Sequence, residues 1–391
     1  MSLRARAHVC LSSIDWNYLW QGPQEVMTRL ARSGSQVLFV EHMGVRRPYL
    51  ADWRRVLQRI LDWGAHPVGR AGPEPGITIL SPVVLPFPWS GAARSINRLL
   101  FADRLPQRAK RLGMTGPVVW TFVPTPIAVD TIRAFRGQRG CAAYYCVADF
   151  EAVTDRPTLM RASEDALLSE VDVVFVGGRV LKERFEGRHH NVILAPFAVA
   201  DHFFAAGTGV AADLEAIPHP RVGYIGGLHR HMDQPLLERV AALMPDIQFV
   251  FVGPKVSGDW QLEQMPNVHM LGRREHHLLP AYVDGFDVGF VPYSLSEFTE
   301  TVWPTKLHEY LARGKPVVST PLPEVKLLDY DLRAVRIGGT PEKVVDAIRS
   351  ALSDLPHWQH ERRELAREHS WARLVDRMTT EIDRCVAAHH S

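Results

Sequence analysis

The sequence predicts an α/β protein built from two Rossmann-like domains in tandem. The chain has 391 residues, more than one ordinary hydrophobic core of about 150 residues accommodates. Strand-like apolar runs alternate with helical stretches in both halves, and this alternation is typical of parallel sheets covered by helices. Residues 197–220 contain several Gly and Pro and no apolar period, which indicates a linker.

These boundaries give a first domain at residues 1–200, a second at residues 216–370, and a helix at residues 371–391 that packs back on the first domain. Open parallel sheets bind ligands beyond the carboxyl ends of their strands. We therefore expect the two domains to face each other across a ligand cleft.

The elements of the first half follow from apolar periodicity and flanking Gly or Pro. The expected strands are 8–12, 36–41, 77–81, 118–122, 142–147 and 171–176, and the expected helices are 23–33, 91–111, 126–135 and 158–170.

The second half repeats the pattern more cleanly. Its expected strands are 221–225, 248–252, 268–271, 288–292 and 316–320, and its expected helices are 235–244, 276–286, 305–312, 341–353 and a terminal stretch at 358–388.

Composition excludes several classes of protein. Apolar residues make up 46% and charged residues 23%, as in ordinary globular proteins. Apolar runs stay well below the roughly 20 residues that cross a bilayer, and the first residues lack the apolar core of a secretory signal, so we expect a cytoplasmic protein. The net charge of +2 argues against a nucleic-acid partner. Four cysteines without CxxC spacing indicate a reduced compartment.

Positive charge is concentrated in residues 46–111, which contain twelve Lys and Arg against four Asp and Glu. Within this region, residues 49–61 place aromatic and aliphatic side chains at near-helical spacing among arginines. Such a helix lies either on an anionic membrane surface or on the domain, with a core face and a solvated basic face.

Two motifs in the second half suit a phosphate ligand. Gly223-Tyr-Ile-Gly-Gly227 ends a predicted strand, and glycines there let backbone amides approach a diphosphate. A simple tight turn explains the same glycines. In the second motif, Pro304 stands where a helix begins, and Lys306 and Glu309 lie one turn apart on that helix. A cation beside helix-start amides suits phosphate, and a carboxylate one turn later can accept hydrogen bonds from ribose hydroxyls. The alternative is an ordinary exposed ion pair.

Together these elements resemble the donor domain of glycosyltransferase-B (GT-B) fold enzymes. The likeness is to glycosyltransferase family 4 and to teichuronic-acid-type sugar transferases, and it spans most of the chain. The elements that carry it appear in the family's order: residues 224–227 followed by Asp233, then 250–254, 267–272, 286–292 and 304–318.

The resemblance implies roles for named residues. Lys306 would neutralise the donor diphosphate, Glu309 would hold the ribose, and Arg273 would lie beside the nucleobase. Further donor-site residues would be Gly226, Gly227, Thr299, Glu300, Thr301 and Thr305. Many family members carry two glutamates separated by seven residues, whereas here Thr301 takes the first position and Glu300 is one place off. The sequence therefore leaves open the contacts to the transferred sugar and the stereochemistry.

The first half supplies acceptor and base candidates. Residues 14–24 resemble the family's first strand-to-helix loop, which implies that Asp15, Trp16 and Gln21 contact the acceptor. If configuration is inverted, a base must deprotonate the acceptor hydroxyl. Asp149, at the end of an apolar strand, is the first candidate, with a capping role as the alternative. Asp15 is the second candidate.

These expectations combine into a hypothesis. The chain would be a metal-independent hexosyltransferase that takes a UDP-, GDP- or dTDP-sugar and acts in cell-surface polysaccharide synthesis. The acceptor would be a glycan or a lipid-linked molecule, and the enzyme would lie peripherally on the inner membrane face. The His pairs lack matching metal ligands, so no metal or other cofactor is expected. The alternatives are a nucleotide-sugar epimerase and a non-catalytic nucleotide-sugar-binding module.

Overall fold

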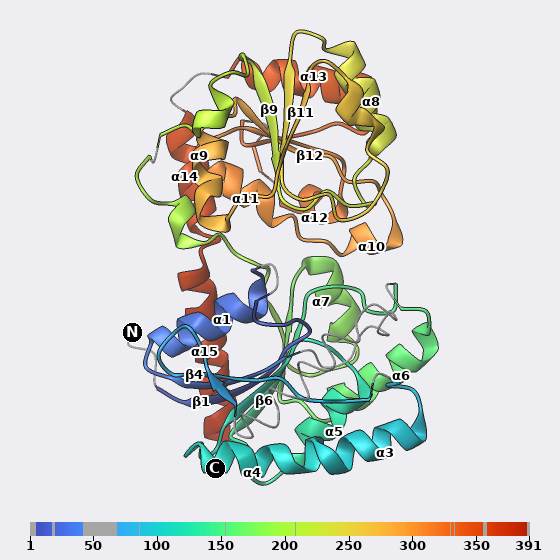
Figure 1. Ribbon diagram of the computed structural model, residues 1–391, viewed down its shortest axis with the longest axis vertical. Coiled ribbons are helices and arrows are strands. Elements are labelled where there is room, and N and C mark those ends of the chain that lie inside the picture. The colour runs from blue at the N-terminus through green and yellow to red at the C-terminus, as the bar shows by residue number, and fades with distance from the viewer. Residues whose placement is uncertain are drawn as a thin grey trace. The chain divides into compact units, whose positions relative to one another are not determined.

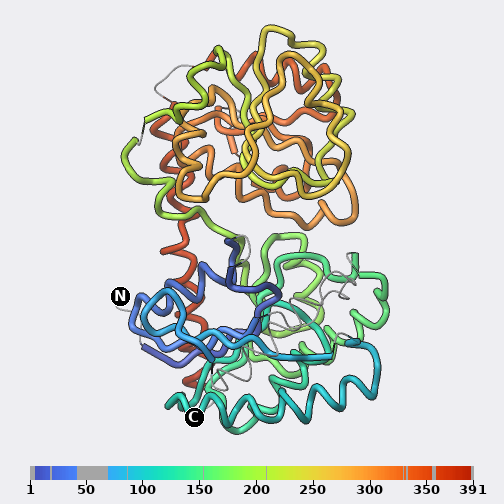
Figure 2. Tube along the Cα trace, viewed as in Figure 1, coloured from blue at the N-terminus to red at the C-terminus, as the bar shows by residue number. Residues whose placement is uncertain are grey.

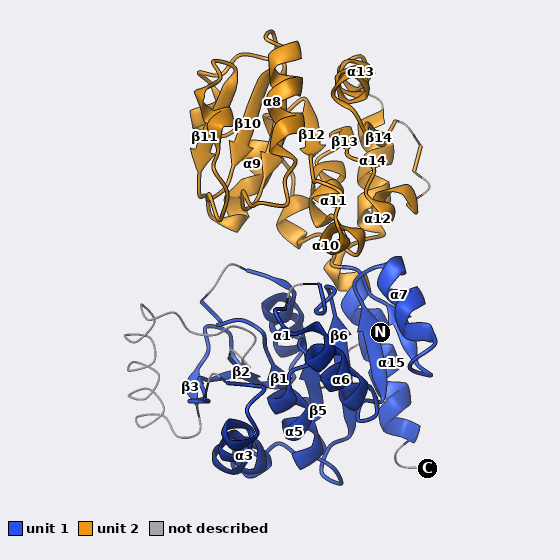
Figure 3. Ribbon diagram, turned by 90° about the vertical axis from the view of Figure 1, so that its right-hand side faces the viewer, with its two compact units in different colours: residues 1–196, 374–391 blue, residues 197–373 orange. Residues whose placement is uncertain are grey.

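A computed structural model describes residues 5–17, 20–41, 69–85, 87–152, 154–207, 209–328, 330–331, 333–354 and 358–388. The chain divides into two compact units (Figure 3). Unit 1 combines Met1–Pro196 with Leu374–Ser391, and unit 2 is Phe197–Arg373. The basic helix expected at residues 49–61 lies outside the described residues.

Unit 1 contains an eight-stranded sheet in the order β3-β4-β2-β1-β5-β6-β7-β8. Neighbouring strands are parallel, except that β3 runs antiparallel to β4 at one edge. The strands are β1 (Ala7–Leu11), β2 (Gln36–Val40), β3 (Arg70–Ala71), β4 (Ile77–Leu80), β5 (Val118–Thr121), β6 (Cys141–Cys146), β7 (Val173–Val176) and β8 (Val192–Leu194). The chain moves outward from β1 in one direction and then from β5 in the other, so the topological switch lies between β1 and β5.

Helices cover both faces of this sheet, as alternate residues of β6 show. Tyr144 points toward α6 (Pro157–Leu168), where its hydroxyl donates to Glu164 at 2.9 Å. Tyr145 faces the other way, within electrostatic range of Arg377 on α15. The remaining helices of unit 1 are α1 (Gly22–Arg32), α3 (Gly91–Leu100), α4 (Leu105–Arg111), α5 (Pro126–Ala134) and α7 (Arg179–Glu186) (Figure 1).

The helix α15 (Trp371–Ala388) returns the chain to unit 1 after unit 2 is complete (Figure 2). Leu374, Met378 and Ile382 on α15 are buried. The Arg6 guanidinium donates to Asp383 at 2.6 and 2.9 Å, tying the helix to the residue before β1. The first and last segments of the chain thus complete one hydrophobic core.

Unit 2 contains a six-stranded parallel sheet in the order β11-β10-β9-β12-β13-β14. Numbered within the unit, this is 3-2-1-4-5-6, the order of the dinucleotide-binding fold. The strands are β9 (Arg221–Ile225), β10 (Gln248–Val252), β11 (Val268–Gly272), β12 (Val288–Val291), β13 (Val317–Ser319) and β14 (Val335–Ile337). The α-helices are α8 (Gln234–Leu243), α9 (Leu279–Asp284), α10 (Glu297–Glu300), α11 (Thr305–Ala312), α12 (Pro323–Lys326), α13 (Pro341–Leu352) and α14 (Trp358–Arg367).

The α/β class and the two parallel-sheet domains agree with the sequence prediction, but two long predicted helices are broken. The stretch 91–111 is interrupted at Phe101, whose φ of −127° leaves the helix and whose ring is buried in the core. The stretch 358–388 is interrupted between α14 and α15. At Phe101, burial of the ring outweighs the local helical period. Between α14 and α15, the backbone instead pairs with Val199, whose amide donates to the His369 carbonyl at 2.8 Å.

Candidate functional site

The strand order of unit 2 predicts where a ligand binds. The chain leaves β9 to build one side of the sheet and returns through β12 to build the other. The loops after these two strands diverge, and a ligand can enter between them at the carboxyl edge. Gly226 and Gly227 follow β9, and residues 292–304 connect β12 to α11.

Gly226 is the residue that brings the backbone and a cation together. Its φ of +121° lies in the left-handed region that favours glycine. A Cβ on Gly226 would lie 2.4 Å from Cε and 3.0 Å from Nζ of Lys306. On the other side, a Cβ on Gly253 would lie 1.8 Å from the Gly226 carbonyl oxygen. The backbone conformation therefore favours glycine at position 226, and close packing against the backbone requires glycine at position 253.

Two tyrosines hold the Lys306 ammonium in this position. Its Nζ lies 5.5 Å from the centre of the Tyr224 ring and 5.9 Å from that of Tyr293, distances at which cation–π attraction operates. Burial alone would lower the pKa of Lys306, but the Tyr293 phenol and the Glu309 carboxylate more than offset it and raise the pKa. The side chain is thus a cation at neutral pH.

Helix α11 carries Lys306 in its first turn and is fixed to the sheet through Tyr310. The Tyr310 hydroxyl accepts a hydrogen bond of 2.9 Å from the amide of Ile225, the last residue of β9. Its ring packs on Gly289 of β12, where a Cβ would lie 2.3 Å from a ring carbon. Pro304 occupies the position before the first helical residue, Thr305, without a side-chain cap, so the first amides of α11 are not covered by a capping side chain.

Glu309, one turn along α11, is 9% exposed and meets the loop that follows β11. Its Oε1 lies 3.9 Å from Nε2 of His276, which opens a short turn at His276–Leu278. Arg273, between β11 and this turn, is exposed. The structure thus brings the β11 loop and α11 together around Glu309.

His229 belongs to this site, although the sequence indicated no role for it. Burial, followed by the nearby charge of Lys306, lowers the His229 pKa to about 4, so its imidazole is neutral at pH 7. Its ring lies 5.4 Å from that of Tyr293. The position of His229, two residues after Gly227, is the only sequence signal for it, since the loop after the first strand of such sheets faces the ligand.

The threonines of the polar loop have structural contacts. The Thr299 hydroxyl donates to the Ser294 carbonyl at 2.6 Å and completes a capping box with Ser296 at the start of α10. The Thr301 hydroxyl points to the Phe298 carbonyl at 3.4 Å, and both threonines are 1% exposed. Glu300 between them is exposed. Their roles toward a ligand stay a prediction.

In unit 1, hydrogen bonds and ring packing at Trp16 hold the loop after β1 in place. The Trp16 backbone amide donates to the Glu41 carboxylate at 2.8 Å, and the Trp16 backbone carbonyl accepts from the Gln24 side-chain amide at 3.2 Å. The Trp16 ring is 5% exposed and stands edge-on to Phe39. Asp15 is half-buried, and Gln21 is exposed at the start of α1. Asp15 and Gln21 are thus the more accessible of the three residues expected to contact an acceptor.

Asp149 follows β6 in unit 1 and makes several local contacts. Its Oδ1 accepts from the amides of Glu151 and Ala152 at 3.0 and 3.2 Å, and its Oδ2 pairs with Arg184 on α7. These are the contacts of a residue that caps a turn. They leave its role as a base a prediction. Among the described residues, no group of three His, Cys, Asp or Glu is placed to hold a metal ion.

A comparison with known protein families finds a match in the segment that carries this site. Residues 219–354 match the model of the family described as Glycosyl transferases group 1. This segment includes Gly226, Lys306 and Glu309. The matched segment lies entirely within unit 2.

A curated relative and several solved structures agree with the GT-B expectation. The chain is 30% identical over 228 residues to a Bacillus subtilis (strain 168) protein that bears the name teichuronic acid biosynthesis glycosyltransferase TuaH. The alignment covers 56% of this chain and 55% of that protein, so the match spans about half of the relative's length.

The solved structures cover nearly the whole chain. HepE of Anabaena in complex with UDP aligns with a TM-score of 0.70 at 13% identity, over 97% of this chain and 100% of that one. Sucrose-phosphate synthase of Thermosynechococcus elongatus aligns with a TM-score of 0.67 at 14% identity, over 98% and 100%. At this identity the likeness concerns the fold, which is of the GT-B class with two parallel-sheet domains.

Replacing Gly226 tests the packing of unit 2. The variant Gly226→Ala must strain the left-handed backbone and also displace the Lys306 side chain. Gly209 also has a positive φ, of +82°, but a Cβ added there would have no atom within 4 Å, so Gly209→Ala is the control. Backbone strain costs both variants about 1 kcal/mol. We expect Gly226→Ala to lose about a further 1–3 kcal/mol through overpacking, measured by urea unfolding. Equal losses in the two variants would show that Lys306 does not depend on this glycine.

Proposed function

We propose that the chain is a glycosyltransferase that moves a hexosyl group from a nucleotide-diphosphate sugar to a glycan or lipid-linked acceptor. The observation that carries the proposal is the Lys306 ammonium held over Gly226, at the start of α11 and at the switch point of the sheet. A cation, uncapped helix-start amides and close backbone meet there, and all three favour a diphosphate.

The site residues take distinct roles in this proposal. Lys306 and the amides around Gly227 and Thr305 neutralise the charge that develops on the diphosphate as the glycosidic bond breaks. Glu309 accepts hydrogen bonds from the ribose hydroxyls, and His276 at 3.9 Å orients its carboxylate. Arg273 lies beside the nucleobase. Because Lys306 supplies the positive charge at the leaving group, the transfer we propose is metal-independent.

A uridine donor is the first of the three donor classes to test. HepE was solved with UDP, and the Escherichia coli trehalose-6-phosphate structure with UDP-2-fluoro glucose. Their likeness to this chain supports UDP ahead of GDP and dTDP. Residues 299–301 line the diphosphate or the sugar in this proposal through the backbone, since the Thr299 hydroxyl is bonded to a carbonyl.

Nucleotide-induced stabilisation of the folded protein tests the donor site. A ligand at about 100 times its Kd stabilises the native state by about 2.7 kcal/mol. We expect UDP to raise the Tm, and Lys306→Ala and Glu309→Ala each to weaken UDP affinity by about tenfold to a hundredfold. Lys343→Ala, which removes an exposed lysine of α13, is the matched control.

A panel of UDP, GDP, dTDP and ATP in the same assay identifies the donor class. Wild-type affinity for nucleotide in both site variants, or no response to any diphosphate nucleoside, would contradict the proposed site.

Asp149 is the general base in this proposal if the reaction inverts configuration. The competing reading, a nucleotide-sugar-binding module without turnover, draws on Thr301, which stands where many family members have a glutamate and has its hydroxyl directed to a carbonyl. Transfer activity decides between the two.

The variant Asp149→Asn separates catalysis from capping. Asparagine keeps an oxygen that accepts from the amides of residues 151 and 152, and it is as good a cap as aspartate. We expect a slightly lower Tm, because the ion pair with the partly exposed Arg184 is lost, and unchanged UDP affinity, with transfer slowed by about a hundredfold or more. Full transfer activity in Asp149→Asn would exclude it as the base, and absence of turnover in the wild type would favour the binding module.

We further propose that the transfer takes place at the inner membrane face, in cell-surface polysaccharide synthesis, as the name of the Bacillus subtilis relative suggests. The described residues include no helix long and apolar enough to cross a membrane. A different helix from the one expected at residues 49–61 supports contact with the surface. On α3, Ile96, Leu99 and Leu100 are 43%, 63% and 39% exposed, and Arg94 and Arg98 lie among them.

The net positive charge of residues 91–111 favours anionic lipid, although Arg94 and Arg98 are themselves paired with Asp130 and Asp103. Asn97 fixes the helix by exchanging hydrogen bonds with the backbone of Leu85 at 2.7 and 3.0 Å, which leaves the apolar side chains pointing outward. Residues 91–111 contain six Lys and Arg and one Asp. Exposed aliphatic side chains among cations are typical of helices that lie in a lipid interface.

Vesicle sedimentation tests this face. Burying a leucine contributes about 1.5–3 kcal/mol, so the double variant Ile96→Ser/Leu99→Ser should weaken binding to phosphatidylglycerol vesicles by about a hundredfold. Leu159→Ser, at a leucine of α6 that is 42% exposed, is the control within unit 1 and should bind as the wild type does. Equal binding by all three proteins would remove α3 from the membrane proposal.

A further inference from the structure

A second cationic pocket lies in unit 2, at the edge of the sheet opposite the carboxyl ends of the strands. Its volume is about 370 Å³, and its floor is formed by the end of α9, the end of α11 and the residues before β13. Lys306 lies at the other end of α11, so this pocket is separate from the proposed donor site. Four cations and one carboxylate line it: Arg313, Lys315, Arg363, Arg367 and Asp284.

Arg313 and Asp284 neutralise each other and form the rigid floor. Two guanidinium nitrogens of Arg313 donate to the Asp284 carboxylate at 2.7 and 2.5 Å. The third nitrogen donates to the carbonyls of Phe203 and Ala205 at 3.1 and 2.6 Å. The hydrogen-bonding capacity of this arginine is therefore largely used, and it is not available to a ligand.

Lys315 and Arg363 differ from Arg313, because neither has a carboxylate within 4 Å of its charged group among the residues that the structure describes. The Lys315 ammonium makes one hydrogen bond, of 2.8 Å, to the backbone carbonyl of Asp284. Burial lowers the pKa of Lys315, and the cations Arg313 and Arg363 lower it further against the opposing attraction of Asp284 and Asp287. Bringing these like charges together has a cost, which an anion between them would reverse.

Glycine at position 314 allows the Arg363 side chain to lie close to the backbone beside Lys315. Gly314 has a φ of +76°, and a Cβ there would lie 3.3 Å from the Arg363 side chain and 3.0 Å from that of Gln359. Gln359, Arg363 and Arg367 are spaced four residues apart on α14 and share one face of that helix. All three line the pocket, and Nε of Arg367 pairs with Glu364 at 3.4 Å.

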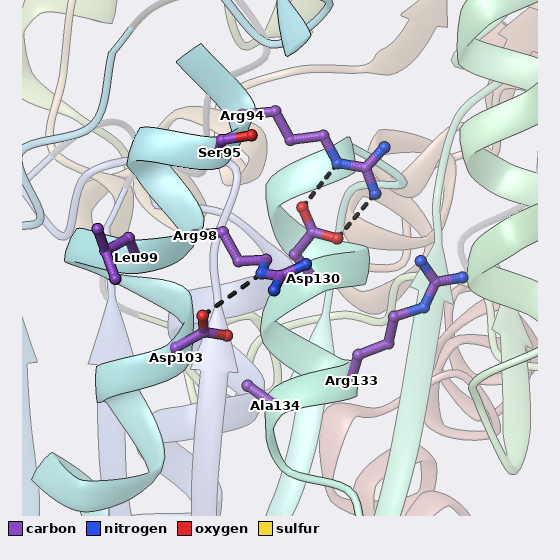
Figure 4. Close-up of a pocket in the computed structure, with 8 residues that line it drawn as sticks. All are labelled: Arg94, Ser95, Arg98, Leu99, Asp103, Asp130, Arg133 and Ala134. Carbon is purple, nitrogen blue, oxygen red and sulfur yellow. Dashed lines mark hydrogen bonds and ion pairs between the residues drawn. The ribbon is translucent and has the colours of Figure 1, made fainter. Parts of the chain in front are cut away.

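The pocket of unit 1 provides a contrast. It has a volume of about 480 Å³ and is lined by three arginines on α3 and α5. Figure 4 shows Arg94 paired with Asp130 and Arg98 with Asp103, at 2.7 and 3.4 Å. The third, Arg133, pairs with Glu170 at 2.8 Å. Every cation there has a carboxylate, so an anion would have to displace one.

We propose that the pocket of unit 2 binds a small, soluble phosphate-bearing anion between Lys315 and Arg363. Its unpaired positive charge, its size and its access from solvent suit such a ligand. Arg363 offers a fork that matches two phosphate oxygens, and Lys315 offers a point charge from the floor. The site does not depend on the donor chemistry, because no residue is shared between them.

Calorimetric titration with inorganic pyrophosphate at fixed ionic strength tests the site. We expect the wild type to bind pyrophosphate, and Arg363→Gln and Lys315→Gln each to weaken binding by about tenfold or more. Arg363 is exposed, so its replacement leaves the fold intact even if Lys315→Gln does not. Arg98→Gln removes the same charge from the balanced pocket and should bind normally.

Two further arms separate this site from other sources of binding. Lys306→Ala, which disables the proposed donor site, should retain the pyrophosphate affinity assigned to Lys315 and Arg363. Loss of all pyrophosphate binding in Lys306→Ala, or wild-type binding in Arg363→Gln and Lys315→Gln, would overturn the proposal. Arg363→Gln should also sediment with phosphatidylglycerol vesicles as the wild type does. Weaker sedimentation would assign the pocket to a lipid headgroup and refute the soluble ligand.

Discussion

The close approach of the Lys306 side chain to the backbone at Gly226 is the constraint on which the rest of unit 2 depends. A side chain at position 226 would occupy the space of the lysine stem, and a side chain at position 253 would collide with the Gly226 carbonyl. The residues that directly follow β9 and β10 must therefore lack side chains. That same condition exposes peptide amides beside a cation, so the packing requirement and the chemistry of the site have one origin.

Holding the lysine there requires that α11 cannot move. Tyr310 binds the helix to β9 on one side. On the other side, His308 is buried, hydrogen-bonded to Tyr330 at 3.0 Å and stacked on Trp303. Tyr330 is in turn hydrogen-bonded at 2.7 Å to His369. Burial lowers the pKa of His308 well below its usual range, so this second contact brings no competing positive charge toward Lys306.

Much of the fold could be predicted because it rests on local patterns. Alternating apolar strands and amphipathic helices are visible in both halves, and Gly226 and Lys306 stand out by their spacing from a strand end and a proline. The first residues of α11 follow from the same signals, whereas the order of the strands within each sheet is known only from the structure. These patterns do not show which polar side chains already form hydrogen bonds or ion pairs within the protein.

The less predictable features depend on long-range contacts. Whether Thr299 faces a ligand or its own loop depends on the carbonyl of Ser294, and the pairing of Asp149 with Arg184 requires β6 and α7 to meet. The role of His229 depends on its proximity to Lys306, which is 77 positions later in the chain and cannot be inferred from local sequence. The strand β14 has three residues, too few to show a period. Phe101 ends its helix because its ring is buried in the core.

The return of α15 to unit 1 has a consequence for how the protein is made. Residues 374–388 leave the ribosome after all of unit 2, yet Leu374, Met378 and Ile382 belong to the core that β1 begins. Until then, the part of the core that these three side chains complete stays open, and Arg6 lacks its partner Asp383. Unit 2 is a continuous segment and can fold during synthesis, whereas the unit that starts the chain is the last to be completed.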